Sequence, residues 1–326
     1  MLSTKGIGEV HVMKTMLVTA AALLTFAATN AQASTTNLLA FGDSLVDSGN
    51  IAAATTASGG AFPFTIYPNG QFTNGDAWTT QLGLAPSLLG GSNYAYGGAR
   101  AVDNGDATPD LFEQVNQFRE TNTGFSDDAV AMIWVGGNDF LDLPDSPTLE
   151  QAGEAISAVV SKISVVVAHL NELGLSEFLV LGLPDFGILP ANAGDPAASA
   201  QASFLTDTYN AALQAGLAAL DFALPTADVS YFDIDGFFQE VIADLPPELV
   251  SVPCLADPAG CAADPTNYAL YDDIHPSAWV HTALAEAIAE DLGISLSEVP
   301  LPATAPLLLA GLGGLGLWAR RRKSRA

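Results

Sequence analysis

Short apolar segments alternate with longer helical patterns through the middle of the chain, and this alternation restricts the fold more than any other feature of the sequence. It is typical of a parallel β-sheet wrapped by α-helices. We therefore predict an α/β domain of three layers, α/β/α, built on a mainly five-stranded parallel sheet. The predicted strands cover residues 37–41, 92–96, 129–135, 177–183 and 229–233.

The clearest helix is predicted over residues 149–173. Thr148 and Gln151 have the spacing of a capping box, apolar residues recur every three or four positions, and Gly174 is suited to end the helix. Two further helices are predicted, over 198–222 and 276–292.

Proline and glycine positions guide two further predictions. Pro276 is expected at the first position of the last helix, where its missing N–H has no cost. Residues 51–86 are rich in Gly, Thr, Pro and Asn and have little periodicity, so we expect loops there, with at most a short helix near 78–82.

Polar or small residues follow the ends of the predicted strands. Ser44, Gly98 and Asn138 come after the first three strands, and Asp272 and His275 precede the last helix. The carboxyl ends of parallel strands share one edge of the sheet, so these residues are expected to lie together. They supply what acyl transfer through serine needs: a hydroxyl, a base, a carboxylate that orients the base, and donors for an oxyanion.

Histidine is scarce, which narrows the choice of base. His169 lies beside the apolar stripe of the long helix, where a packed or solvent-facing role is expected, and His281 lies two turns into the last helix. His275 has a carboxylate three residues before it and is the candidate general base.

Each motif alone also has an ordinary structural interpretation. Gly42-Asp43-Ser44 is compatible with a turn or a helix cap, and the acidic run before Pro276 with a helix entrance. Their occurrence together and in order favours the functional interpretation.

Four blocks of the chain resemble those of the GDSL, or SGNH, family of serine esterases and lipases. The resemblance extends from about residue 38 to 292. The blocks are FGDSLVDSGN at 41–50, NYAYGGA at 93–99, GGND at 136–139 and DDIH at 272–275.

This resemblance implies a flavodoxin-like fold and hydrolysis of acyl esters without a metal or cofactor. It implies Ser44 as the nucleophile and His275 as the base, with Asp272, not Asp273, as the orienting acid. The oxyanion donors would be the N–H groups of Ser44 and Gly98 and the side chain of Asn138, with Gly97 not excluded.

The stretch at 69–78, NGQFTNGDAW, is similar to the branch of secreted phospholipases and haemolysin-like lipases. Hydrolysis of carboxylic esters is the expected activity, with a phospholipase or an acyltransferase as alternatives that use the same site. A surface or matrix-binding protein with a silent site is a third possibility.

The amino-terminal end has the pattern of a secretory signal peptide over residues 1–33. A positive start, an apolar stretch and the small-residue sequence Ala31-Gln32-Ala33 predict a mature chain from Ser34. Because the first twelve residues do not fit such a signal, translation is expected to start at Met13 or Met16.

The carboxy-terminal end, 297–326, has an apolar span at 303–319 followed by a basic cluster at 320–325. Together with Val299-Pro300-Leu301-Pro302-Ala303 it resembles the VPLPA variant of PEP-CTERM sorting tails. This implies export in a Gram-negative bacterium and an exosortase-type enzyme as a partner. We expect tethering to the inner membrane by the tail alone and then release, with a permanent tail anchor as the alternative.

The chain between the two ends is strongly acidic. Residues 34–302 contain 35 Asp and Glu but only Arg100, Arg119 and Lys162, for a net charge near −32. Nucleic acid is excluded as a partner, because few groups are present to neutralise phosphates. No acidic cluster has the spacing of a calcium loop, so no metal site is predicted.

The two cysteines of the chain, Cys254 and Cys261, lie seven residues apart. In an exported chain such a pair predicts a disulfide that closes a small loop, with a structural and not a catalytic role.

Overall fold

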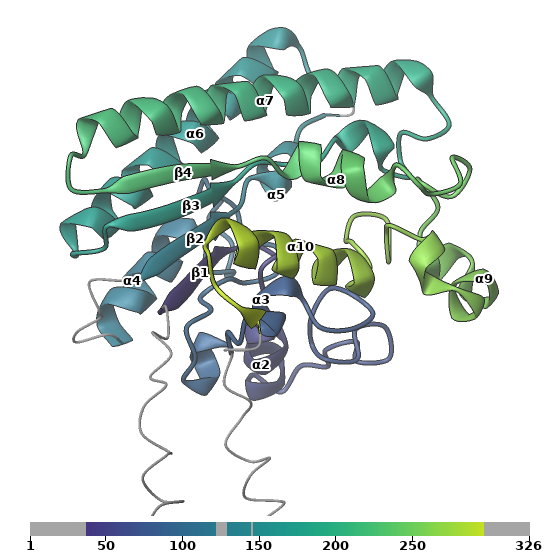
Figure 1. Cartoon of the computed structure of the whole chain (residues 1–326), viewed down its shortest axis with the longest axis horizontal. Helices are drawn as coiled ribbons and strands as arrows, with labels where there is room; N and C mark the ends of the chain where they lie inside the picture. Colours follow the sequence, from purple (N-terminus) through teal and green to yellow (C-terminus); the bar gives the residue numbers. More distant parts are fainter. Residues whose placement is uncertain (1–36, 122–128, 145, 297–326) are drawn as a thin grey trace, which may run out of the picture. The chain divides into compact units, whose positions relative to one another are not determined.

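A computed structural model describes residues 37–121, 129–144 and 146–296 (Figure 1). All of these described residues belong to one compact unit. The predicted signal peptide at 1–33 and the predicted sorting tail at 297–326 lie outside the described residues.

The centre of the described unit is a parallel sheet with the strand order β1-β2-β3-β4. Phe41 of β1 is paired with Ile133 of β2, which is paired in turn with Val180 of β3. All residues of β1 and β2 are buried, because helices cover both faces of the sheet. The strands are Leu38–Gly42 (β1), Val130–Trp134 (β2), Glu177–Leu181 (β3) and Asp228–Phe232 (β4).

Helices flank the sheet as predicted, and the three-layer α/β/α architecture is confirmed. Helix α6 packs against α4 and α7 on one side of the sheet, and α10 packs against α3 on the other (Figure 1). The longer helices are Asn50–Ala57 (α2), Leu111–Thr121 (α4), Leu149–Glu172 (α6), Pro196–Ala223 (α7), Ile234–Ile242 (α8) and Ala278–Asp291 (α10). The short ones are Trp78–Gln81 (α3), Gly137–Leu141 (α5) and Pro258–Ala263 (α9).

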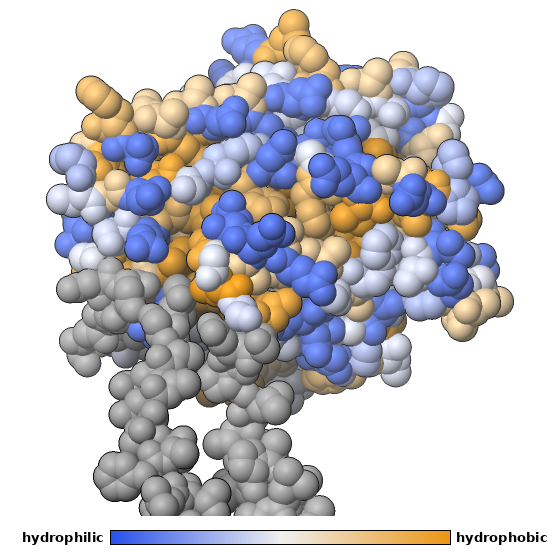
Figure 2. All heavy atoms as spheres, in the orientation of Figure 1, coloured by the Kyte–Doolittle hydropathy of each residue, from blue (hydrophilic) through white to orange (hydrophobic). Residues whose placement is uncertain are grey.

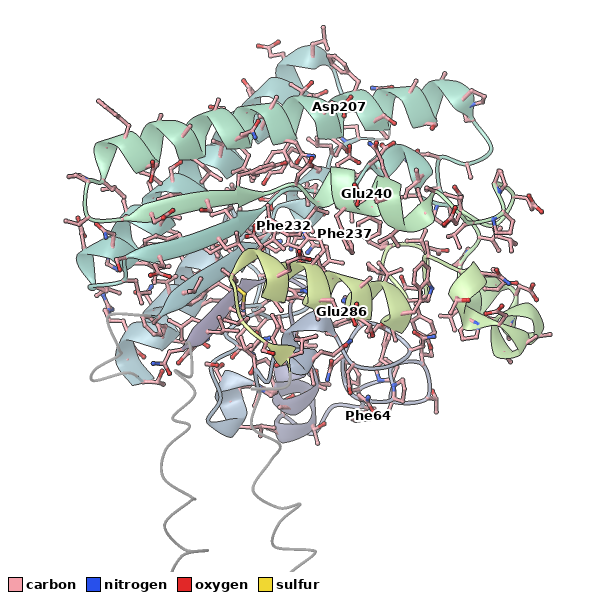
Figure 3. The ribbon with its side chains drawn as sticks, viewed as in Figure 1. Phe64, Asp207, Phe232, Phe237, Glu240 and Glu286 are labelled. Carbon is pink, nitrogen blue, oxygen red and sulfur yellow. A yellow bond between two sulfur atoms is a disulfide. The ribbon has the colours of Figure 1, made fainter. Side chains whose placement is uncertain are left out.

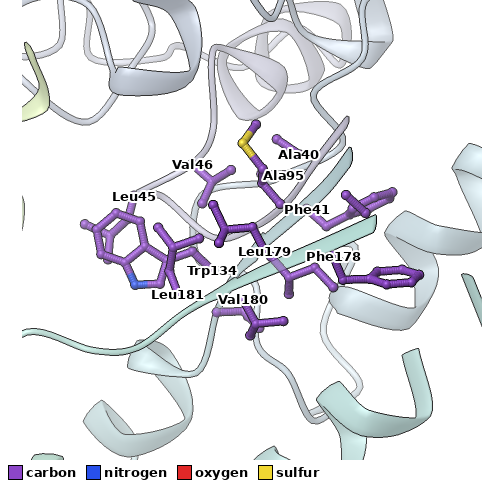
Figure 4. Close-up of a cluster of buried hydrophobic side chains, with 14 of the residues drawn as sticks. Ala40, Phe41, Leu45, Val46, Ala95, Trp134, Phe178, Leu179, Val180 and Leu181 are labelled. Carbon is purple, nitrogen blue, oxygen red and sulfur yellow. The ribbon is translucent and has the colours of Figure 1, made fainter. Parts of the chain in front are cut away.

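The main core lies around the strands, where the side chains of Phe41, Trp134 and Phe178 are buried (Figure 4). Helix α6 has the length and apolar composition of a membrane span, but its buried face, which includes Ile163 and Val166, belongs to this core. Its apolar stripe is therefore explained by packing into the main core.

One of the five predicted strands, the second in chain order at 92–96, is wrong as a strand, although the segment runs beside β1. Ala40 donates a backbone hydrogen bond to Ser92 and accepts one from Tyr94, which makes a single parallel bridge. The pairing is incomplete beyond this bridge because the Gly42 N–H donates to Gln114 Oε1, at 2.8 Å, and not to the 92–96 segment. The Gly42 oxygen accepts from the Tyr96 N–H and also from Gln114 Nε2. The flavodoxin-like arrangement persists with four strands and one extended edge segment.

The long helix begins and ends as its sequence predicts. Thr148 and Gln151 form both hydrogen bonds of the capping box, and Gly174 has a φ of 106° just beyond the last turn. Residues with a side chain rarely adopt a positive φ, so glycine is suited to this position. Helix α7 agrees with its prediction to within two residues at each end.

Two helix predictions are corrected. Only one short helix is expected within residues 51–86, yet α2 forms because the Asp47 carboxylate accepts hydrogen bonds from the N–H groups of Asn50 and Ile51 in its first turn. Pro276 is not the first residue of α10. It is held in a bridge with Leu270, so the helix starts at Ala278.

Candidate active site

Ser44 lies directly beyond β1, at the carboxyl edge of the sheet. The chain turns sharply there, because Asp43 accepts backbone hydrogen bonds from both Val46 and Asp47. Gly42 precedes this turn with a φ of 154°, and a Cβ on it would lie 2.1 Å from the carbonyl oxygen of Trp134. The close approach of β2 therefore requires glycine before the serine.

His275 lies next to Ser44, with 2.8 Å between its Nε2 and the serine Oγ. Its other ring nitrogen, Nδ1, lies 2.8 Å and 2.9 Å from the two carboxylate oxygens of Asp272. A carboxylate at Nδ1 favours the tautomer with the proton on that nitrogen, which leaves Nε2 free to accept the serine proton.

The Asp272 carboxylate is held by the loop that carries it. Its Oδ1 accepts hydrogen bonds from the N–H groups of Ile274 and His275, at 2.9 Å and 2.8 Å. Burial alone would raise the pKa of Asp272, but the hydrogen bond and charge of His275 and the two backbone donors lower that pKa to about 2. Asp272 is therefore ionised at neutral pH, and its neighbour Asp273 is exposed and makes none of these contacts.

Gly97 and Gly98 are distinguished by their surroundings. The Gly97 N–H donates to the Asp47 carboxylate at 2.9 Å, and a Cβ on Gly97 would overlap the Phe72 ring. Gly98 is exposed and has a φ of 86°, and a Cβ added to it would meet no atom within 4 Å. Among the residues that the structure describes, no group accepts from the Gly98 N–H, so it is available to a ligand.

Asn138 lies in the first turn of α5, immediately after β2. Its Nδ2 donates a hydrogen bond of 2.8 Å to the carbonyl oxygen of Ala99, next to Gly98. An amide nitrogen carries two hydrogens, so one donor remains for a ligand. The hydrogen bond thus joins the two loops that contain the predicted oxyanion donors.

Asp47 connects the serine loop to the glycine loop, and sequence reasoning gave it no role. Its carboxylate accepts from four backbone N–H groups, those of Gly49, Asn50, Ile51 and Gly97. Burial raises the pKa of Asp47 to about 6, against the lowering effect of these donors. Its position in the block at 41–50 was the only signal in the sequence.

The other two histidines of the described chain do not take part in the Ser44–His275–Asp272 arrangement. His281 is buried, and burial together with the charge of His275 lowers its pKa to about 3, so it stays neutral. Its Nδ1 accepts a hydrogen bond from the Trp78 N–H. His169 stacks on Phe112, so of the packed and solvent-facing roles expected for it, the structure shows packing.

Aromatic side chains from the loop before α3 surround the candidate base. The Phe72 ring stacks on the His275 ring, with 5.2 Å between centroids, and contacts the rings of Phe62 and Tyr67. Phe64, labelled in Figure 3, extends this group outward and is 49% exposed. These rings form an aromatic wall beside the His275 ring.

The predicted disulfide between Cys254 and Cys261 is present, with 5.2 Å between the Cα atoms. It belongs to a small cluster with Tyr268 and Tyr271, directly before the acid of the site. Among the described residues no group of three or more His, Cys, Asp or Glu side chains is arranged to hold a metal ion.

Comparison with known proteins gives two family matches. The model of the GDSL-like lipase/acylhydrolase family matches residues 38–288, and that of the PEP-CTERM protein-sorting motif matches residues 298–323.

Individual relatives are more distant. A phosphatidylcholine-sterol acyltransferase of Aeromonas hydrophila is 28% identical over 230 residues, covering 68% of this chain and 65% of that protein. A GDSL esterase/lipase of Arabidopsis thaliana is 25% identical over 312 residues, covering 76% and 85%. The chain thus spans just under two thirds of the length of the Aeromonas protein. A solved acetylxylan esterase of Geobacillus stearothermophilus is 18% identical, with a TM-score of 0.45 and coverage of 80% and 95%.

Proposed function

The chain belongs to the GDSL-like lipase/acylhydrolase family and carries a PEP-CTERM protein-sorting motif, and on this basis we propose that it is an exported serine hydrolase that cleaves carboxylic acyl esters. The observation that carries the proposal is the contact series from Ser44 Oγ to His275 Nε2 at 2.8 Å and from His275 Nδ1 to Asp272 at 2.8 Å. No cofactor is needed for this chemistry.

The first half of the reaction forms an acyl-serine. His275 Nε2 takes the proton of Ser44 as Oγ attacks the ester carbonyl carbon, and the carbonyl oxygen becomes an oxyanion. The N–H groups of Ser44 and Gly98 and the amide of Asn138 donate hydrogen bonds to that oxygen. The intermediate then collapses, the C–O bond of the ester breaks, and the alcohol leaves with the proton from His275.

The second half returns the enzyme to its starting state. A water molecule gives a proton to His275 and attacks the acyl carbon, and the acid leaves as Ser44 regains its proton. If an acceptor alcohol enters in place of water, the acyl group is transferred to it. The acyltransferase alternative is favoured by one finding, the similarity to the Aeromonas acyltransferase.

Turnover of short nitrophenyl esters tests the proposal, with and without a primary alcohol as acceptor. The parent protein should release nitrophenol, and Ser44→Ala should not. Ser58→Ala, at an exposed serine just past α2, is the matched control and should keep the parent rate. Nitrophenol release that Ser44→Ala retains would disprove the role of Ser44, and an inactive parent would favour the surface-protein alternative.

The acceptor experiment separates the two chemistries. If the alcohol raises total nitrophenol release and an alkyl ester accumulates, the enzyme acts as a transferase. If free acid remains the product, it acts as a hydrolase. Because residues 34–302 hold 35 acidic and three basic side chains, we also propose a preference for soluble, short-to-medium esters over anionic lipid surfaces.

We further propose that an exosortase-type enzyme removes the tail after export, following transient tethering to the inner membrane. The support is the sorting motif at 298–323, which contains the whole apolar span at 303–319. Mass spectrometry of the protein from its native host tests this. Loss of residues 307–325 agrees with processing, and their retention would mean a permanent anchor.

A further inference from the structure

The loop that carries the aromatic wall is bonded to the segment that carries the acid and base. Five hydrogen bonds join residues 66–78 to residues 271–281. Their donor and acceptor pairs are Tyr67 Oη and Asp272 Oδ2, the Tyr271 hydroxyl and the Ile66 oxygen, Thr73 Oγ1 and the Pro276 oxygen, the Ala278 N–H and Asn74 Oδ1, and the Trp78 N–H and His281 Nδ1.

Among these bonds, the one from Tyr67 reaches a member of the candidate triad directly. Its hydroxyl donates to Asp272 Oδ2 at 2.7 Å, and Oδ2 also lies 2.8 Å from His275 Nδ1. The other carboxylate oxygen, Oδ1, is held by two backbone N–H groups. Within the described chain, two side chains therefore hold the Asp272 carboxylate in place, those of His275 and Tyr67.

The ring of Tyr67 has packing partners of its own, which makes the hydroxyl separable from the ring. The ring centroid lies 5.1 Å from that of Phe72, 6.0 Å from that of Tyr271 and 6.3 Å from that of His275. A phenylalanine at position 67 keeps these contacts and removes only the donor. Burial and the hydrogen bond to Asp272 raise the pKa of the tyrosine, so the hydroxyl keeps its proton at neutral pH.

We propose that Tyr67 is a positioning residue for the triad, holding the Asp272 carboxylate against His275 Nδ1 and linking the triad to the aromatic wall at the substrate side. The proposal rests on the proposed serine hydrolase function. It gives Tyr67 no contact with the reacting atoms. It assigns a role in the reaction to a residue that lies outside the four sequence blocks.

The expected direction of the pH effect follows from the charges around the pair. Tyr67 and Tyr271 face Asp272, the exposed Asp273 acts through its charge on Tyr67, and the neutral His281 faces His275. Without the Tyr67 hydroxyl, the Asp272 carboxylate accepts one hydrogen bond fewer. Its negative charge then stabilises the protonated form of His275 more strongly. The acid limb of the kcat/KM profile therefore moves to higher pH in Tyr67→Phe.

The test compares Tyr67→Phe with Tyr271→Phe on a short nitrophenyl ester. Tyr271→Phe is the matched control. It also removes a tyrosine hydroxyl from this aromatic group, but that hydroxyl donates to the backbone oxygen of Ile66 and not to Asp272. For Tyr67→Phe we expect about a tenfold loss of kcat, the size of one hydrogen bond to a charged group, with KM within twofold and the acid limb shifted upward. Tyr271→Phe should show no shift of that limb.

The proposal would be overturned if the two variants had equal effects, or if kcat of Tyr67→Phe lay within twofold of the parent. The hydrogen bond from Tyr67 to Asp272 would then have a structural role only. Proton NMR of the Nδ1 proton of His275 gives a readout that does not depend on turnover. Its resonance should move in Tyr67→Phe and stay in place in Tyr271→Phe, and an unmoved resonance would also overturn the proposal. An inactive parent would contradict the proposed function, and the NMR comparison would still decide the role of Tyr67.

Discussion

The side-chain amide of Asn138 donates a 2.8 Å hydrogen bond to the carbonyl oxygen of Ala99, so the loop after β2 is fixed to the loop that presents Gly98. One amide hydrogen is used in this bond, and the other is left to face a bound substrate. The same side chain therefore holds the glycine loop in place and is available as an oxyanion donor.

Replacement of Asn138 by alanine should lower kcat by about 10²–10³, the usual cost of one oxyanion donor, with a smaller change in KM. Steady-state kinetics on a short nitrophenyl ester measure both quantities. Thermal melting serves as the control, since the bond to Ala99 is lost as well. A kcat within threefold of the parent in a folded variant would remove Asn138 from the site.

The two neighbouring carboxylates at 272 and 273 give a matched pair of substitutions. Asp272→Asn removes the charge beside His275 Nδ1 and permits the wrong tautomer, which costs about 10⁴ in kcat in serine protease triads. Asp273→Asn changes an exposed side chain and should leave kcat within twofold of the parent. Kinetics of the two variants check this, and a larger loss for Asp273→Asn than for Asp272→Asn would reverse the assignment.

Asp43 should make stability depend on pH. Burial raises its pKa to about 7, with a lowering contribution from the Leu45 N–H and a further increase from the charge of Asp139. Because this pKa exceeds the usual value of 3.8, the folded state keeps a proton that the unfolded state has released between about pH 4 and pH 7. The extra proton on Asp43 therefore stabilises the folded state at low pH, and this stabilisation is lost as the pH rises towards 7.

Asp43→Asn tests this contribution, because asparagine keeps an oxygen that accepts from Leu45. Between pH 5 and pH 7 the free energy of unfolding of the parent should fall by about 2 kcal/mol more than that of the variant, at roughly 1.4 kcal/mol per pH unit and proton. Urea unfolding at both pH values measures it. The lowered pKa of His281 makes stability rise with pH, in the opposite direction. This contribution is the same in the parent and in Asp43→Asn, so it cancels when the two are compared. Identical pH dependence would contradict the burial argument.

Added salt should stabilise the protein. Residues 34–302 carry a net charge near −32, and hydrophilic side chains are spread across the face drawn in Figure 2. Mobile ions screen the repulsion between such exposed charges within about 10 Å at 0.1 M salt. The Tm should rise between 10 mM and 0.5 M NaCl in a calorimetric scan. A flat or falling Tm would show that repulsion does not limit stability.

Features set by local sequence are predicted well. The capping box of Thr148 and Gln151 and the regular apolar stripe define α6 within the chain itself, and the apolar runs at strand positions define β1 to β4. The edge segment at 92–96 does not form the predicted strand because its pairing with β1 is interrupted by Gln114, a residue on α4. No local pattern reveals such a competitor.

The same distinction applies to the site. Ser44, Gly98, Asn138, Asp272 and His275 lie in recognisable blocks, and their roles remain predictions until they are tested. Tyr67 and Asp47 contribute through contacts with distant parts of the chain, which spacing does not encode. Helix α2 is missed for a related reason, since the Asp47 carboxylate and not apolar periodicity fixes its first turn.

Labelling with a fluorophosphonate tests the central proposal most directly, because the reagent phosphonylates a serine only when a neighbouring base activates it. Peptide mass spectrometry of the parent should find one adduct, on Ser44, and none in Ser44→Ala. His275→Ala should be labelled far more slowly, since Nε2 of His275 lies 2.8 Å from the serine Oγ. An adduct on another residue, or equal labelling of the parent and Ser44→Ala, would contradict the assignment of Ser44 as the nucleophile.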